Sequence, residues 1–167
     1  NGKVYQRSEK AIRRSLFVAL SKRYLGVQAK AIFRAAHVTA PTFYAHNENV
    51  NAALINCETD LEKNYIQLIS KVTKREVAWT IMLTFIERNR DYFRATTRAR
   101  DFYLLQRMID DIRPVLIGTG DISKKSYNLY IFEAIGIIDC WMRFDNFDKN
   151  LIDQYVKKLA QLRFMRF

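Results

Sequence analysis

The chain of 167 residues is poor in the residues that build turns and metal sites: it has five glycines, two prolines, two cysteines and two histidines. Glycine and proline are the residues that tight turns require, so their scarcity favours long helices over an all-β fold. The absence of a Cys/His cluster argues against a zinc site. Cys57 and Cys140 lie far apart on predicted apolar helical faces, which favours two buried free thiols over a disulfide.

Long uncharged runs and catalytic motifs are also missing. No stretch of eighteen apolar residues is free of charges, so we predict no membrane span and expect a cytoplasmic protein. The chain has no Gly-rich phosphate loop, no Ser-His-Asp arrangement at a recognisable spacing and no helix with paired metal ligands. Asp110 and Asp111 are adjacent, so they point about 100° apart on a helix and form no natural dyad. We therefore expect neither an enzyme nor a cofactor.

Positive charge is abundant and concentrated at the N-terminus. The net charge is +11, and the first 47 residues carry nine basic residues against one acid, Glu9, which leaves only +3 for the rest of the chain. Such a positive end indicates a polyanionic partner, with nucleic acid first and an acidic membrane surface second. A solvated basic surface without a partner is the alternative that charge alone leaves open.

Apolar residues make up 49% of the chain and recur at helical spacing. The pattern predicts an all-α fold, with helices over residues 8–23, 28–36, 40–46, 50–72, 75–90, 100–117, 123–144 and 148–164. Ser8 is expected to cap the first helix, and Leu25-Gly26 to end it. Residues 91–99 are predicted to be an Arg-rich connector with one helical turn at most. Pro114 should kink or end its helix early.

Two short predicted helices, 28–36 and 40–46, are joined by a turn at His37-Val38. Thr39 is placed to cap the second of them, and Pro41 falls in its first turn, where a missing N–H costs nothing. This spacing is typical of a helix-turn-helix. A recognition helix this short brings only its first-turn side chains near base edges in the major groove. The candidate DNA-contacting residues are Thr39, Ala40, Pro41 and Thr42, with Lys30 as a further phosphate contact.

The segment from Val27 to Leu54 resembles the DNA-binding head of the TetR family, and within it Ala31–His46 looks like that family's second helix, turn and recognition helix. The Thr-Phe-Tyr-x-His run at Thr42–His46 is its most specific part. The resemblance implies a helix-turn-helix domain over residues 1–48 and a ligand-binding and dimerisation domain over 49–167. It also implies that Tyr44 and His46 hydrogen-bond backbone phosphates. The chain departs from the family pattern at His37, Asn47 and Val50, which weakens the expectation of specific operator binding.

The family resemblance implies a homodimeric regulator, usually a repressor, that binds double-stranded DNA at a near-palindromic operator in a bacterial nucleoid. Release by a small apolar effector is left open. One alternative is a protein-interaction module of the same shape whose DNA binding is weakened, and a weaker one is a carrier of lipophilic small molecules.

Residues 127–144 are apolar nearly all round, so the predicted helix must be covered on every side. We expect a partner subunit to cover it in a four-helix bundle, as the resemblance also implies; the alternative is a helix wholly inside one protomer. The expected dimer interface consists of Ile131, Phe132, Ile135, Gly136, Ile138, Asp139, Met142, Tyr155 and Leu159.

Aromatic and Met side chains in the middle of the body suit an adaptable apolar cavity. The expected lining of a ligand pocket is Trp79, Met82, Phe85, Phe102, Tyr103 and Met108. Plain core packing is the alternative for each of these residues.

Overall fold

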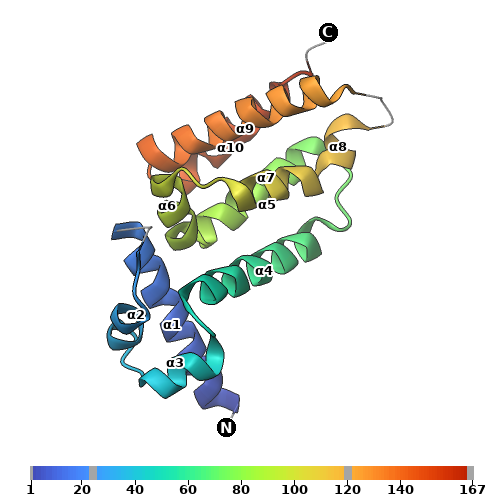
Figure 1. The fold of residues 1–167 in the computed structure, drawn as a ribbon. Coiled ribbons are helices and arrows are strands. Elements are labelled where there is room, and N and C mark those ends of the chain that lie inside the picture. The colour runs from blue at the N-terminus through green and yellow to red at the C-terminus, as the bar shows by residue number, and fades with distance from the viewer. Residues whose placement is uncertain (1, 23–25, 119–121, 165–167) are drawn as a thin grey trace. The chain divides into compact units, whose positions relative to one another are not determined.

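The computed structural model describes residues 2–22, 26–118 and 122–164, and these ranges are helical with no β-strand (Figure 1). The predicted all-α class is thus confirmed. The α-helices are α1 (Gly2–Lys22), α2 (Ala29–Ala35), α3 (Ala40–His46), α4 (Val50–Ile69), α5 (Arg75–Arg88), α6 (Arg90–Ala99), α7 (Tyr103–Asp111), α8 (Arg113–Ile117), α9 (Lys124–Phe144) and α10 (Ile152–Gln161). A short 3-10 helix, Lys149–Leu151, precedes α10.

Helix α1 begins two turns earlier than its sequence pattern predicts. Ser8 lies inside the helix rather than at its cap, and its Oγ donates to the carbonyl oxygen of Tyr5 at 2.8 Å. No glycine or proline stands between Lys3 and Ser8 to stop the helix from extending towards Gly2. The predicted C-terminal end at Leu25-Gly26 falls partly outside the described residues, although Gly26 has the positive φ of 76° that such an end uses.

The prediction of a loop-like connector over residues 91–99 is wrong, because this segment is helix α6. Its inward face includes Tyr92 and Phe93 together with Thr96 and Thr97, both of which are 4% exposed. Each of these threonines can bury its methyl group within a helix. Counting threonine as polar hides this face and leaves the segment looking hydrophilic throughout.

Pro114 acts as expected and divides the predicted helix 100–117. The segment forms α7, which ends at Asp111, and α8, in which Pro114 occupies the first turn. A proline there removes no helical hydrogen bond, whereas inside one continuous helix it would.

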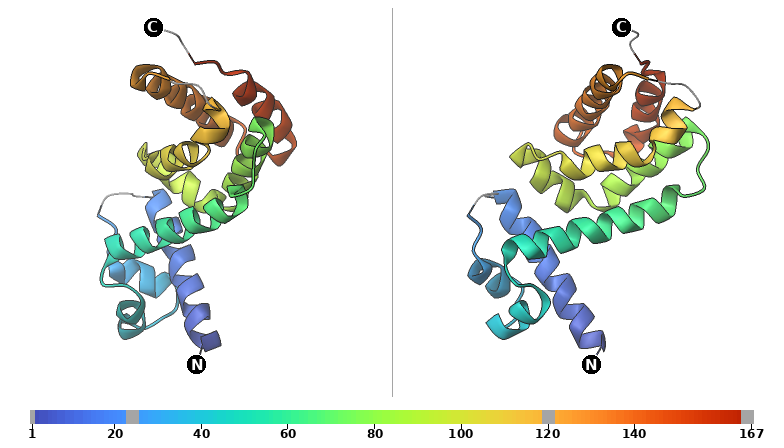
Figure 2. Two further views of the ribbon diagram at one scale, coloured as in Figure 1. Left: turned by 90° about the vertical axis from the view of Figure 1, so that its right-hand side faces the viewer. Right: turned by 45° about the vertical axis from the view of Figure 1, so that its right-hand side comes forward.

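The chain divides into two compact units, and the first comprises Asn1–Leu61 and Asp91–Asp101. Its core contains Ile12, Leu16, Ile32 and Phe43, which are at most 2% exposed. Figure 2 shows α2 and α3 along one side of α1. The carbonyl of Ser21, near the end of α1, accepts a hydrogen bond from Arg98 of α6 at 3.0 Å.

The second unit comprises Glu62–Arg90 and Phe102–Phe167. Helix α10 packs against both α5 and α9. The fully buried Trp141 of α9 donates its Nε1–H to the carbonyl oxygen of Asp148 at 2.9 Å, which fixes the chain between α9 and α10. Cys140, expected to be buried, is exposed, whereas Cys57 of the first unit is buried. Among the described helices, none combines the length and apolar character needed to cross a lipid bilayer.

Candidate nucleic-acid interface

Helix α3 starts where the sequence predicts. Thr39 is its N-cap, with extended backbone angles (φ −79°, ψ 159°), and its Oγ1 accepts a hydrogen bond from the Thr42 N–H at 3.3 Å. The two threonine hydroxyl oxygens are 2.9 Å apart and hydrogen-bonded. The cap fixes the first turn of α3 and satisfies one of the N–H groups that a helix start leaves unpaired.

This capping reduces what α3 can offer to a phosphate. Pro41 has no N–H, and the Thr42 N–H is already bonded to Thr39. Among the first three residues of the helix, only Ala40 retains an N–H for an outside acceptor. The start of α3 therefore has few backbone N–H groups available to bind a phosphate.

The side chains of α3 divide into an anchor and an exposed set. Phe43 is fully buried and lies 6.3 Å from the ring of Phe33, so it fixes α3 against α2. Tyr44 packs its edge against Phe43 but is 54% exposed. Among the other candidates, Thr39, Pro41 and Lys30 are exposed, and Ala40 and Thr42 are half-buried. Lys30, Thr39, Pro41 and Tyr44 are thus the exposed members of the predicted DNA-contacting set.

His46 does not belong to this exposed set. Its Nε2 is hydrogen-bonded to the Oγ of Ser8 at 2.8 Å, and its Nδ1 is buried. The ring of Tyr5 lies over it with a centroid distance of 3.9 Å. Both ring nitrogens are thus directed into the protein, and the expected phosphate contact by His46 is replaced by a contact between α3 and α1.

The partners of His46, Tyr5 and Ser8, were not predicted from the sequence. They precede Ile12 at steps of three and four, so they lie on the same face of α1 as the buried Ile12, although Tyr5 is 51% exposed. Extending the apolar stripe of α1 backwards past Ser8 would have found them. A polar and an aromatic residue at these positions carry no apolar signal, which is why the stripe seemed to start at Ile12.

The turn between α2 and α3 holds a strained residue. His37 has a φ of 54°, a left-handed conformation that glycine adopts without cost. The turn is closed by hydrogen bonds from the N–H of His37 to the Arg34 carbonyl (3.1 Å) and from the N–H of Val38 to the Phe33 carbonyl (3.0 Å). Two backbone bonds therefore hold the angle between the helices despite the side chain at position 37.

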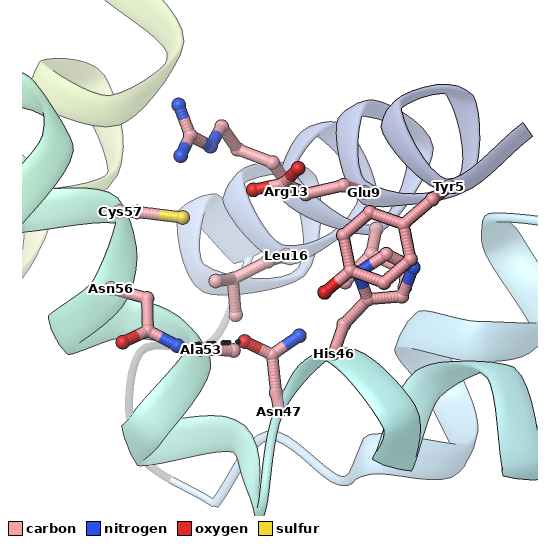
Figure 3. Close-up of a pocket in the computed structure, with 10 residues that line it drawn as sticks. Tyr5, Glu9, Arg13, Leu16, His46, Asn47, Ala53, Asn56 and Cys57 are labelled. Atoms are coloured by element: carbon pink, nitrogen blue, oxygen red, sulfur yellow. Dashed lines mark hydrogen bonds between the residues drawn. The ribbon is translucent and has the colours of Figure 1, made fainter. Parts of the chain in front are cut away.

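The far end of α3 is tied to α4. Asn56 of α4 donates its Nδ2–H to the Oδ1 of Asn47 at 3.2 Å, as Figure 3 shows. Asn47, one of the departures from the family pattern, therefore joins the two helices by an amide pair.

A cavity of about 50 Å³ lies beside this junction (Figure 3), lined by Tyr5, Glu9, Ile12, Arg13, Leu16, His46, Asn47, Ala53, Asn56 and Cys57. Pockets that hold metabolites are several times larger, roughly 300 Å³ or more. Burial raises the pKa of the Cys57 thiol to about 11, although the Arg13 guanidinium acts in the opposite direction. The thiol is therefore protonated at neutral pH, and we assign the cavity no ligand.

Electrostatics favour an anionic partner for the first unit. It contains twelve Lys or Arg residues and six Asp or Glu residues, a net charge of +6 in 72 residues. Arg13 is neutralised by Asp60, with 2.5 Å between nitrogen and oxygen. The remaining positive charge on α1 and α2 attracts polyanions, and the range of this attraction becomes shorter as salt is added.

The residues expected to line a ligand pocket do not form one uniform set. Trp79, Met82 and Met108 are fully buried in the core of the second unit, and Phe85 is 6% exposed. Phe102 is half-buried at the N-cap of α7, and Tyr103 is 59% exposed. The Nε1–H of Trp79 is buried without a hydrogen-bond partner, which makes it the one polar group of this set within the core.

The expected dimer interface is likewise split by burial. The side chains that face the core of the protomer, and so cannot present a surface, are Ile131, Ile138, Met142, Tyr155 and Leu159. Phe132 is 71% exposed, Gly136 is exposed, and Ile135 and Asp139 are half-buried. A Cβ added to Gly136 would meet nothing within 4 Å. The outward residues all belong to α9.

No family model matches the chain, and neither the curated proteins nor the solved structures compared with it include a significant match.

Proposed function

We propose that the chain is a TetR-type transcriptional regulator, a repressor in its usual form, which binds a near-palindromic operator as a homodimer. The observation that carries the proposal is the short, capped helix α3. Its buried Phe43 anchors it, and it leaves Thr39, Pro41 and Tyr44 exposed on a unit of net charge +6. In this proposal α2 and α3 are the helix-turn-helix, and α3 lies in the major groove.

The roles of the α3 residues follow from their chemistry. Ala40 and Pro41 have no donors for base edges but can touch a thymine methyl group, and Thr42 is the first-turn polar side chain. Tyr44 and Lys30 are exposed and can reach backbone phosphates. We therefore expect Tyr44→Phe to weaken binding to every duplex alike, and Thr42→Ala to change which sequence is preferred.

Selection of bound duplexes from a random pool is the direct test. The proposal expects a two-fold repeat whose half-sites lie about one helical turn apart, since protein symmetry is mirrored in the DNA. Enrichment should be measured for the natural chain, Thr42→Ala and Tyr44→Phe side by side. If Thr42→Ala lowered affinity equally for all sequences, its proposed role in base recognition would be refuted.

Homodimerisation rests on the outward face of α9. Phe132 is 71% exposed there, and the exposed Gly136 lies one turn further along on the same face. Helix α10 turns its buried side inward and exposes Asp153, Gln154, Lys157 and Lys158. The outward side of α9 also carries exposed polar residues, including Asn128 and Glu133, so the proposed apolar contact between two copies centres on Phe132 rather than on the α9–α10 pair that a four-helix bundle uses.

A second candidate is a protein-interaction module of the same shape. Its support is the poverty of donors on α3, where Pro41 lacks an N–H, the Thr42 N–H is capped, and His46 is bonded to Ser8. This candidate predicts stable dimers that enrich no sequence from the random pool.

A further inference from the structure

The anchor on the inward side of α3 determines which of its residues face outward. Phe43 is 0% exposed and marks the inward direction. At about 100° per residue, Pro41 lies about 160° from Phe43 and Ala45 about 200°, so both are close to the opposite side of the helix. Both residues are exposed. We call this pair, which is one helical turn apart, the α3 ridge.

The polar residues of α3 lie on the two flanks of the ridge. Tyr44 is about 100° from Phe43 in one direction, and Thr42 is about 100° from it in the other. Tyr44 is 54% exposed, whereas Thr42 is half-buried and its hydroxyl is bonded to that of Thr39 at 2.9 Å. The centre of the outward face therefore consists of two apolar side chains with no donor or acceptor.

Neighbouring helices hold the inward side of α3 and so fix the direction of the ridge. The ring of Phe43 lies 6.3 Å from that of Phe33 in α2. His46, about 60° from Phe43 around the helix, is bonded to Ser8 of α1 at 2.8 Å. A partner that binds along α3 must therefore approach from the side of the ridge.

Ala45 was not among the residues predicted to contact DNA, because only the first turn of the recognition helix was considered. Ala40, which was among them, lies only about 60° from Phe43 and is half-buried. Ala45 follows Pro41 by four residues, which is about 6 Å along the helix axis. Base pairs are about 3.4 Å apart along a duplex. Where α3 follows the groove, the two ridge residues therefore face positions about two base pairs apart.

The chemistry of the bases determines what an alanine on this ridge can recognise. In the major groove thymine presents a C5-methyl group, whereas the other base edges there present hydrogen-bond donors and acceptors. The side chain of Ala45 is one methyl group, so its favourable contact with a base is apolar. Its small size also lets the backbone of α3 approach the base edges more closely than a long side chain would.

We propose that Ala45 is a specificity-determining residue, which contacts the C5-methyl group of a thymine about two base pairs from the position faced by Pro41. This inference rests on the proposed function, since it takes a duplex bound by α3 as the partner. It adds a contact from the second turn of α3 to those proposed for the first turn.

The test uses deoxyuridine, which pairs as thymidine does but lacks the C5-methyl group. Selection from random duplexes with the natural chain gives the duplex to be labelled, and each thymine in it is then replaced in turn. Fluorescence anisotropy gives the ratio of the affinities for the thymine and deoxyuridine duplexes. The ratio is measured for the natural chain, Ala45→Gly and Ala35→Gly. Ala35 is the matched control, because it is also an exposed helical alanine of the first unit but lies in α2.

Loss of one buried methyl contact should lower the affinity of the natural chain about fourfold at one thymine of each half-site. In Ala45→Gly the ratio at that thymine should fall to about one, whereas Ala35→Gly should keep the fourfold ratio. Weaker helix formation in a glycine variant lowers the affinity for both duplexes alike, so it leaves the ratio unchanged. The proposal is overturned if the natural chain senses no thymine methyl group, or if Ala45→Gly retains the full ratio at every thymine.

A second variant tests the same position by gain of a contact. Glutamine is a good helix former, and its amide can make two hydrogen bonds to adenine in the major groove. Ala45→Gln should therefore select adenine at one position of each half-site with about 5- to 150-fold discrimination, whereas Ala35→Gln should select the natural sequence. If the natural chain binds no duplex, the proposed function fails. If it binds and Ala45→Gln selects an unchanged sequence, only the assignment of Ala45 fails.

Discussion

Removal of the Phe132 ring gives a direct test of the α9 dimer. The side chain is 71% exposed in the protomer, so the folded chain gains little from it unless a partner covers it. Full burial of a phenylalanine side chain contributes roughly 1.5–3 kcal/mol. The exposed part then accounts for about 1–2 kcal/mol in each protomer.

A two-fold interface uses the same residue twice, so Phe132→Ala should cost a dimer about 2–4 kcal/mol. Since about 1.4 kcal/mol is a factor of ten, the dimer dissociation constant should rise roughly 30- to 700-fold. The unfolding of the separated protomer should be almost unaffected, because the ring has few contacts there to lose and alanine favours a helix.

Sedimentation equilibrium across a micromolar concentration series would measure the dimer constant, and urea unfolding of dilute protein would measure protomer stability. Tyr103→Ala is the matched control, because Tyr103 is 59% exposed on α7 of the same unit. A natural chain that stays monomeric at micromolar concentration, or an unchanged dimer constant in Phe132→Ala, would refute the reasoning.

Three further predictions concern the first unit and the thiols. Burial raises the pKa of Glu58, although the Tyr92 hydroxyl bonded to it at 2.8 Å acts in the opposite direction, so the folded state binds this proton more tightly than the unfolded state. The stabilisation that protonated Glu58 contributes is present below the ordinary Glu pKa and is lost as the pH rises through the raised pKa of the folded state. Glu58→Gln should therefore be more stable than the natural chain at pH 7 and equal to it in acid, which urea unfolding at both pH values would measure. Cys140 is exposed while Cys57 is buried with a pKa of about 11, so Ellman's reagent should titrate one thiol in the native protein and two in guanidinium; two fast thiols under native conditions would contradict this assignment. His37→Val should lower the free energy of unfolding by about 1 kcal/mol or more because of the positive φ, whereas His37→Gly should change it by under about 0.5 kcal/mol, since relief of strain is offset by glycine's greater unfolded-state entropy; equal stability of the two variants would show that φ carries no cost here.

The elements that sequence analysis placed best are those whose signals are local. Helix α3 begins at Ala40 and ends at His46, as predicted, because Thr39 is a capping residue and Pro41 fits only a first turn. Pro114 divides α7 from α8 for the same kind of reason. Capping and proline geometry involve a few neighbouring residues and need no knowledge of the fold.

The features that were missed depend on distant partners. Helix α6 was missed because Thr96 and Thr97 are buried by packing that a sequence window does not contain. The family resemblance assigned His46 to a phosphate, and its observed hydrogen-bond partner, Ser8, is 38 residues away and was expected to be a helix cap. The polarity of a residue does not show which side of its helix is buried until the neighbouring helices are known. This applies to the threonines of α6 and to the pairing of His46 with Ser8.

Burial also separates two interpretations of α9 that its composition could not. A helix that is apolar on all sides is compatible with a dimer interface and with a wholly internal helix. The structure buries Ile131 and Ile138 within the protomer and leaves Phe132 and Phe144 outside. One face of α9 therefore packs inside the protomer, as the internal interpretation expects. The dimer proposal concerns the opposite side, where the aromatic rings are exposed.

The balance of contacts on the first unit has a consequence for the proposed operator. Thr42 is the first-turn side chain of α3 with a polar group for a base edge, and its hydroxyl is already bonded to Thr39. A good bidentate base contact discriminates by about 1–3 kcal/mol, and α3 has no first-turn side chain that makes one. Cations on α1 are numerous by comparison, and they read no sequence. Selected half-sites should accordingly show one or two discriminated positions, with thymine favoured where Ala40 or Pro41 meets its methyl group. A long, sharply defined consensus would mean that residues outside α3 read the bases, and it would move the recognition surface away from Thr39 and Thr42.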